Sequence, residues 1–159
     1  MSLAGQYEVD GLSDLERKLS LLSKNTQKKV LRAAVRKGAK PVMEEAKGKV
    51  PIGLKSHRTY KGQIVQPGFS ASKVLLRTSA RKRDDYSASA MIGMEREAFY
   101  AINFVELGVA SRGIAPRPWL RPTFNARHEA MIAAIAREID IGIDKAIANQ
   151  IMQAETTGE

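Results

Sequence analysis

The chain has 159 residues, enough for one domain with a core of its own, and its 43% hydrophobic and 27% charged residues exclude wholesale disorder. It has no cysteine and only two histidines, which excludes disulfides, thiolate metal ligands and three-histidine zinc sites. No apolar run is long enough to span a membrane, and residues 1–6 lack a secretory signal, so we expect synthesis in the cytoplasm.

The net charge of +9 is unevenly distributed along the chain. Residues 28–83 hold 16 of the 26 basic residues but only two of the 17 acidic ones. This excess favours a positive face that meets phosphate or an acidic protein surface, although a solvated face kept soluble by charge is an equal alternative.

Two helices are predicted in the N-terminal third. Residues 13–16 have the pattern of a capping box, and leucines at positions 12, 15, 19 and 22 continue one apolar stripe to about Ser23. A second helix is predicted over residues 26–49, because small and apolar residues recur every four positions from Val30 to Ala46. This stripe allows another helix to approach closely, and Pro41 is expected to kink or divide the helix.

The middle of the chain is predicted to hold a long loop and a hairpin. Residues 53–72 predict a mobile basic loop with one short strand at 63–66. Residues 73–79 and 87–93 predict two paired strands, with Arg81, Lys82 and Arg83 at the charged tip as contacts to DNA phosphates or to an acidic partner. Residues 98–108 are compatible with a helix or a strand, since a short apolar run does not show whether its apolar side chains repeat as in a helix or as in a strand.

The last third is predicted to be a connector followed by one long helix. Three prolines keep residues 114–122 mostly extended, and Trp119 with Leu120 is expected to fill the core in preference to a subunit contact. The helix is predicted from Pro122 or Thr123 to about Met152, with a bend at Gly142 and a distal end that packs on a partner, and residues 154–159 are expected to fray. The fold class is therefore α+β: a single domain over residues 1–159 with N-terminal helices, a small antiparallel sheet and a long C-terminal helix.

No pattern in the chain predicts catalysis. Phosphate-binding loops, zinc-protease helices and nucleophile elbows do not occur, so no catalytic residue, metal or cofactor is predicted. His57 and His128 are the only candidate histidine bases, and a hydrolase that uses either is the least favoured function. Glu106 is an acid set in an apolar run, and a structural ion pair with Arg117 or Arg121 is preferred to a role as a general acid.

Two segments resemble a bacteriophage family. An aromatic stretch leads to Phe-Val-Glu-x-Gly, and a second segment reads Arg-Pro-Trp-Leu-Arg-Pro. Together they resemble the neck or tail-completion group of long-tailed bacteriophages, akin to the minor tail protein Z of phage lambda. The matching residues are Phe104, Val105, Glu106, Gly108, Pro118, Trp119, Leu120, Arg121 and Pro122. Val109 and Thr123 stand where that group usually has threonine and alanine.

The resemblance implies a structural protein of the virion, made in the cytoplasm of a bacterial host. It implies a place at the head–tail junction, with other neck or tail proteins as partners and an oligomeric ring as the form of assembly. The basic region is then expected to face the genome, without reading its sequence, or an acidic neighbour. The alternative is a small basic protein that binds DNA without sequence preference and has no role in the virion.

Overall fold

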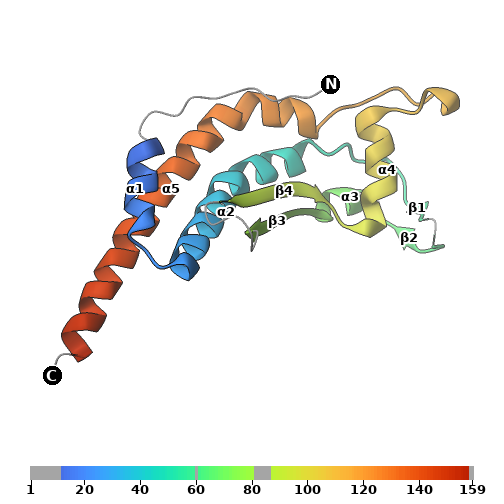
Figure 1. Cartoon of the computed structure of the whole chain (residues 1–159). Helices are drawn as coiled ribbons and strands as arrows, with labels where there is room; N and C mark the ends of the chain where they lie inside the picture. Colours follow the sequence, from blue (N-terminus) through green and yellow to red (C-terminus); the bar gives the residue numbers. More distant parts are fainter. Residues whose placement is uncertain (1–11, 60, 81–86, 158–159) are drawn as a thin grey trace.

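The computed structural model describes residues 12–59, 61–80 and 87–157 (Figure 1). In chain order the elements are α1 (Leu12–Ser20), α2 (Lys24–Lys49), β1 (His57–Arg58), β2 (Ile64–Val65), α3 (Phe69–Ser72), β3 (Val74–Ala80), β4 (Ala88–Met94), α4 (Arg96–Leu107), a 3-10 turn (Ala110–Arg112) and α5 (Leu120–Thr157). The predicted α+β class is confirmed, with helices at the N-terminus, antiparallel strand pairs and a long C-terminal helix. Among the described residues, no helix is long and apolar enough to cross a membrane.

Helix α2 lies at the centre of the fold. It packs along α5 on one side and along the β3–β4 hairpin on the other (Figure 1). One core cluster joins Leu19 and Leu22 near α1 to Val30 and Leu31 of α2 and Ile143 of α5. A second core cluster lies at the opposite end of α2. It contains Ala46, Val50, Ile102 and Trp119.

The close packing of α2 on α5 depends on glycines in both helices. A Cβ atom added at Gly38 would overlap the Cγ1 atom of Ile135, and one at Gly142 would lie 2.8 Å from the Cγ1 atom of Val30. The predicted role of the small-residue stripe is thus confirmed. Pro41 does not divide α2, which is continuous from Lys24 to Lys49. The proline lies on the exposed side of the helix, where water can satisfy the carbonyl group left without its amide partner.

The ends of α1 and α2 differ from the prediction. Helix α1 begins at Leu12, so Ser13 lies within it and is not its cap, and α1 ends at Ser20. Ser23 is the cap of α2, because its hydroxyl accepts a hydrogen bond from the Thr26 amide at 3.4 Å. Residues 24 and 25, which lie between the two predicted helices, therefore belong to the first turn of α2.

A buried glutamine joins the two N-terminal helices. The side-chain amide of Gln27 donates hydrogen bonds to the carbonyl oxygens of Leu19 and Leu22, at 3.0 and 2.8 Å. The Leu19 carbonyl lies in the last turn of α1, and the Leu22 carbonyl lies in the turn that follows that helix. Gln27 thus closes α1 and fixes the angle at which the chain enters α2.

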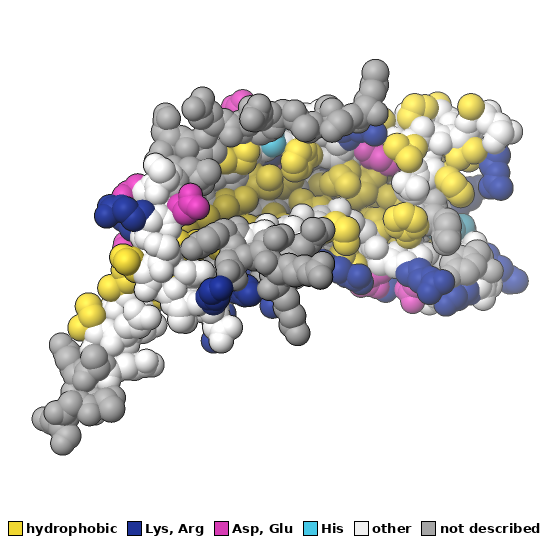
Figure 2. Space-filling model, viewed as in Figure 1, with side chains coloured by type: hydrophobic (Ala, Val, Ile, Leu, Met, Phe, Trp, Pro, Cys, Tyr) yellow, Lys and Arg dark blue, Asp and Glu magenta, His cyan; other side chains and the backbone are white. Residues whose placement is uncertain are grey.

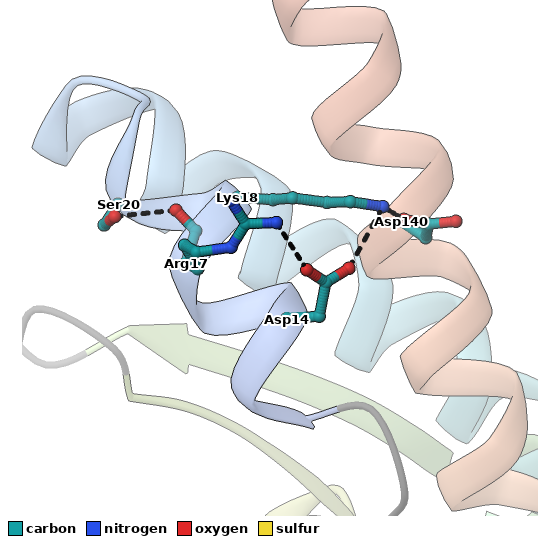
Figure 3. Close-up of polar contacts among 5 residues, drawn as sticks. All are labelled: Asp14, Arg17, Lys18, Ser20 and Asp140. Carbon is teal, nitrogen blue, oxygen red and sulfur yellow. Dashed lines mark hydrogen bonds and ion pairs between the residues drawn. The ribbon is translucent and has the colours of Figure 1, made fainter.

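A charged cluster fastens α1 to α5 (Figure 3). The Lys18 ammonium lies 3.1 Å from Asp140 of α5 and 3.6 Å from Asp14, and Asp14 also accepts a 2.8 Å hydrogen bond from Arg17. The hydrogen bond from Arg17 lowers the pKa of Asp14, and the hydrogen bond to Asp140 raises the pKa of Lys18. Because these side chains are exposed, they orient α1 more than they stabilise it.

The segment between α2 and the hairpin contains more regular structure than its composition predicts. Strands β1 and β2 pair antiparallel, with His57 opposite Val65, and α3 follows directly. The predicted short strand is confirmed at Ile64–Val65. The sequence did not predict strand β1 because a strand of two residues is too short to show the alternation of apolar and polar side chains that is typical of strands.

The predicted hairpin is confirmed. Strands β3 and β4 pair antiparallel from Val74 opposite Met94 to Ala80 opposite Ala88. Its tip, with Arg81, Lys82 and Arg83, lies outside the described residues.

The segment 98–108, for which the sequence allowed a helix or a strand, forms helix α4. Helix α5 begins at Leu120, two residues before the predicted start. Helix α5 continues through Gly142 and ends at Thr157.

Exposed ion pairs link α2 to α5. Glu45 of α2 accepts hydrogen bonds from Arg127 of α5 at 2.6 Å and from Lys49 at 2.7 Å. Lys37 reaches Glu138 of α5 at 2.6 Å. The hydrogen bonds from Lys49 and Arg127 lower the pKa of Glu45.

The first prediction concerns the glycine contact. Gly38→Ala is expected to destabilise the fold by about 1–3 kcal/mol, because overpacking against Ile135 outweighs the gain of about 1 kcal/mol in helix propensity. Gly48→Ala, also in α2 but with open space at its Cβ position, is the matched control and is expected to stabilise by up to about 1 kcal/mol. Denaturant unfolding followed by Trp119 fluorescence measures both. Equal effects of the two changes would contradict the prediction.

The second prediction concerns pH. Because the pKa of Glu45 is lower in the folded protein, its stabilisation is present above the unfolded value of about 4.3 and is lost as pH falls through the folded value. Glu45→Gln is therefore expected to lower the melting temperature at pH 7, with a difference from wild type that shrinks as the pH falls below about 4.3. Glu44→Gln removes the neighbouring exposed charge as a control. A difference that stays constant with pH would contradict the assignment.

Candidate interaction surface

An apolar groove of about 650 Å³ opens on the surface of the described part of the fold. Its walls come from α2, β4 and α5, and the end of α4 closes one side. Figure 2 shows hydrophobic side chains gathered in this hollow between α5 and the hairpin. The lining residues are Val35, Ala39, Ala88, Ala90, Met91, Ile92, Glu106, Leu120, Arg121, Phe124, Met131 and Ile135.

The two sequence motifs meet at one end of the groove through a single carboxylate. Glu106 accepts hydrogen bonds from the backbone amides of Trp119 at 2.6 Å, Leu120 at 3.1 Å and Arg121 at 3.1 Å. These amides lie at the start of α5, where no intrahelical acceptor is available and the helix dipole favours negative charge. Glu106 of α4 therefore caps α5 from a distance of more than a dozen residues along the chain.

The predicted ion pair between Glu106 and Arg117 or Arg121 is thus wrong. The partners are backbone amides, and Arg121 contributes its amide to Glu106. The amides that meet Glu106 lie before the predicted start of the helix at Pro122 or Thr123, whereas α5 begins at Leu120. Proline is tolerated throughout the first turn, where amides have no partner, so the helix can begin before it.

Trp119 fills the core, as predicted. It is 3% exposed and packs in the cluster with Ala46, Val50 and Ile102. Thr123, which is fully buried, donates a 2.7 Å hydrogen bond from its hydroxyl to the Trp119 carbonyl. The departure from alanine at this position therefore adds a hydrogen bond inside the first turn of α5.

Gly108 has a steric role in the first motif. It ends α4 with a φ of 72°, and a Cβ atom there would lie 2.8 Å from the carbonyl oxygen of Ile114 and 2.8 Å from the nitrogen of Pro116. The Arg117 amide then donates to the Val105 carbonyl at 2.7 Å. Gly108 lets the connector fold back on α4, which brings Trp119 and Leu120 to Glu106.

The remaining motif residues lie at the surface. Phe104, Pro118 and Pro122 are exposed, and the Arg112 guanidinium lies 5.7 Å from the centre of the Phe104 ring. Sequence reasoning missed the two facing walls of the groove, where Met91 of β4 is 57% exposed and Phe124 of α5 is 45% exposed. No local pattern signals these two, because strand and helix face each other only in the folded chain.

Basic side chains are exposed along α2. Arg32, Arg36 and Lys40 recur every four residues on its outer side, and the Arg32 guanidinium reaches the Thr78 carbonyl of β3 at 3.5 Å. Arg77 of β3 is also exposed. The described part of the predicted positive region therefore presents a row of cations that starts on α2 and reaches the hairpin.

The two histidines lie on different elements. His57 is exposed on β1, whereas His128 of α5 contacts the Asn125 carbonyl through Nδ1 at 2.8 Å and stacks on Phe124. The described residues contain no group of three or more histidine, aspartate or glutamate side chains placed to hold a metal ion. The geometry defines a helix-rich module with an apolar groove and a row of exposed cations.

Comparison with protein families identifies the class. A family model described as "Bacteriophage HK97-gp10, putative tail-component" matches residues 13–108, which is more than half of the chain. The chain belongs to this HK97-gp10-like family of phage tail components, and the resemblance to a phage tail family is confirmed. The match includes the first motif and ends before Pro118. No curated protein and no solved structure matches the chain.

The third prediction tests the carboxylate cap. Glu106→Ala is expected to destabilise the protein by about 1–2 kcal/mol, because three backbone amides lose their acceptor. Glu106→Gln keeps one acceptor oxygen and is expected to lose less. Glu129→Ala removes an exposed carboxylate from α5 and is expected to stay within about 0.5 kcal/mol of wild type. Urea unfolding gives the three values, and equal effects at positions 106 and 129 would contradict the cap.

Proposed function

We propose that this chain is a structural protein of the virion that acts at the head–tail junction, where it completes the tail or joins it to the DNA-filled head. Its membership of a family of phage tail components carries the proposal. The Pro-Trp-Leu-Arg-Pro segment supports the finer placement, because together with the first motif it resembles the neck and tail-completion group. Its partners are other neck or tail proteins and further copies of itself.

The surface supports a role in assembly rather than catalysis. An apolar groove with exposed Met91 and Phe124 is suited to another protein surface. The exposed cations of α2, together with Arg81, Lys82 and Arg83 in the sequence, are suited to phosphates contacted without base recognition or to an acidic neighbour. No catalytic residue or cofactor is part of the proposal.

The fourth prediction tests the place of action. Deletion of the gene from a phage that carries it is expected to give filled heads and separate or abnormal tails in electron micrographs, since the joint would be incomplete. Expression of the wild-type protein in trans is the control and is expected to restore joined particles. Normal joined virions without the gene would contradict the proposal.

A second function is kept because one observation favours it: the concentration of basic residues within positions 28–83. On this alternative the protein binds DNA without sequence preference and has no virion role. Tight binding of the isolated chain to duplex DNA, falling steeply with salt, would support the alternative. Weak binding to DNA, together with self-association of the chain, would support the proposed role at the head–tail junction.

The fifth prediction concerns the hairpin tip. The triple change Arg81→Glu, Lys82→Glu and Arg83→Glu is expected to lower the yield of joined, DNA-filled particles. It reverses the charge of a cluster that we propose contacts phosphate or an acidic partner. Lys61→Glu, a single reversal in the preceding segment, is the control. Unchanged assembly and DNA retention in the triple variant would reject a contact at this tip.

A further inference from the structure

We propose that the distal end of α5, residues 148–157, docks into the apolar groove of a second copy of this chain. The inference rests on the proposed role as an assembling virion subunit and names the surfaces through which copies meet. Both surfaces belong to the described part of the chain, where the groove is open and the distal end of α5 carries exposed apolar side chains.

The distal end of α5 extends beyond the body of the protein. Ile139, Ile143 and Ile147 join the core cluster of α1 and α2, and Ile147 is the last residue of α5 in that cluster. Ten further residues, about 15 Å of helix, follow to Thr157. Figure 1 shows this end of α5 projecting past the other helices.

The projecting end carries apolar side chains exposed to solvent. Ile151 is 55% exposed and Met152 is 64% exposed. Ile151 continues, one helical turn later, the stripe by which Ile147 meets the core. A helix that presents such a stripe without a partner is suited to a hydrophobic groove.

A single copy cannot fill its own groove with this end. Phe124 lines the groove, and Ile151 lies 27 residues later in the same continuous helix, about 40 Å away. Because α5 is itself a wall of the groove, its far end cannot fold back while the helix stays intact. This helix end can therefore occupy such a groove only in another molecule, and a second copy supplies the matching surface.

Charge favours the same pairing. Residues 148–157 contain one glutamate, Glu155, and no lysine or arginine, so the remainder of the chain carries all of the positive net charge. Arg121 lines the groove and is exposed. An acidic helix end is therefore drawn toward a basic body, which raises the rate of encounter between copies.

The contact joins two different surfaces, so it is heterologous. Each copy keeps one groove and one helix end available for the next copy, and the chain of contacts closes into a ring or continues as a filament. A symmetric dimer through two grooves or two helix ends would not use this pairing.

The absence of cysteine makes the contact testable by disulfide formation. Single variants Met91→Cys and Phe124→Cys label the groove, and Ile151→Cys labels the helix end; all three positions are at least 45% exposed, so folding is expected to persist. Under mild oxidation, a mixture of a groove variant with Ile151→Cys is expected to give the mixed dimer in preference to either homodimer. Leu21→Cys, 72% exposed in the turn after α1, is the control partner and is expected to give little product.

Association in solution provides a second readout. Ile151→Glu and Met91→Glu are each expected to weaken self-association by about tenfold or more in sedimentation velocity, whereas Leu21→Glu leaves it unchanged. Predominant homodimers in the oxidation experiment, or equal cross-linking to Leu21→Cys, would overturn the pairing. A wild-type chain that stays monomeric at high concentration and forms no mixed dimer inside particles would also overturn it.

The same cross-link in assembled particles separates this inference from the proposed function. If deletion of the gene separates heads from tails but particles built with Met91→Cys and Ile151→Cys chains give no mixed dimer, only the docking is wrong. If deletion leaves joined virions, the junction role is wrong whatever the cross-link shows.

Discussion

The approach of α2 to α5 is the constraint on which the rest of the structure depends. At Gly38 and Gly142 the partner helix occupies the space that a side chain would need, so the two helices lie closer than larger residues would permit. With one side of α2 held by α5, its other side receives the β3–β4 hairpin. The apolar groove arises from this order of layers, because α2 forms its floor while β4 and α5 form its opposing walls.

The second constraint is the carboxylate of Glu106, which sets where α5 begins. Gly108 turns the chain back on α4, and Trp119 enters the core beside α2. The amides that start α5 then lie within hydrogen-bond distance of Glu106. The two motifs of the sequence are thus one structural joint.

A tail component functions through the surfaces that it offers to neighbours. The surfaces that we propose for this role are the groove, the projecting end of α5 and the exposed cations of α2, and they lie on different parts of the molecule. The same long helix supplies a wall of the groove and the projecting end. A change in the packing of α5 on α2 would therefore alter both surfaces at once, which couples the stability of the subunit to its assembly.

Local period and composition alone determined the helical nature of α1, α2 and α5, the β3–β4 hairpin, the small-residue stripe of α2 and the buried position of Trp119. These features were predictable because each depends on residues a few positions apart. Tertiary structure decided that residues 98–108 form a helix, that Glu106 caps α5 and that Met91 faces α5 across a groove. Each of these depends on partners that are distant along the chain, and no short-range pattern records which distant groups will meet.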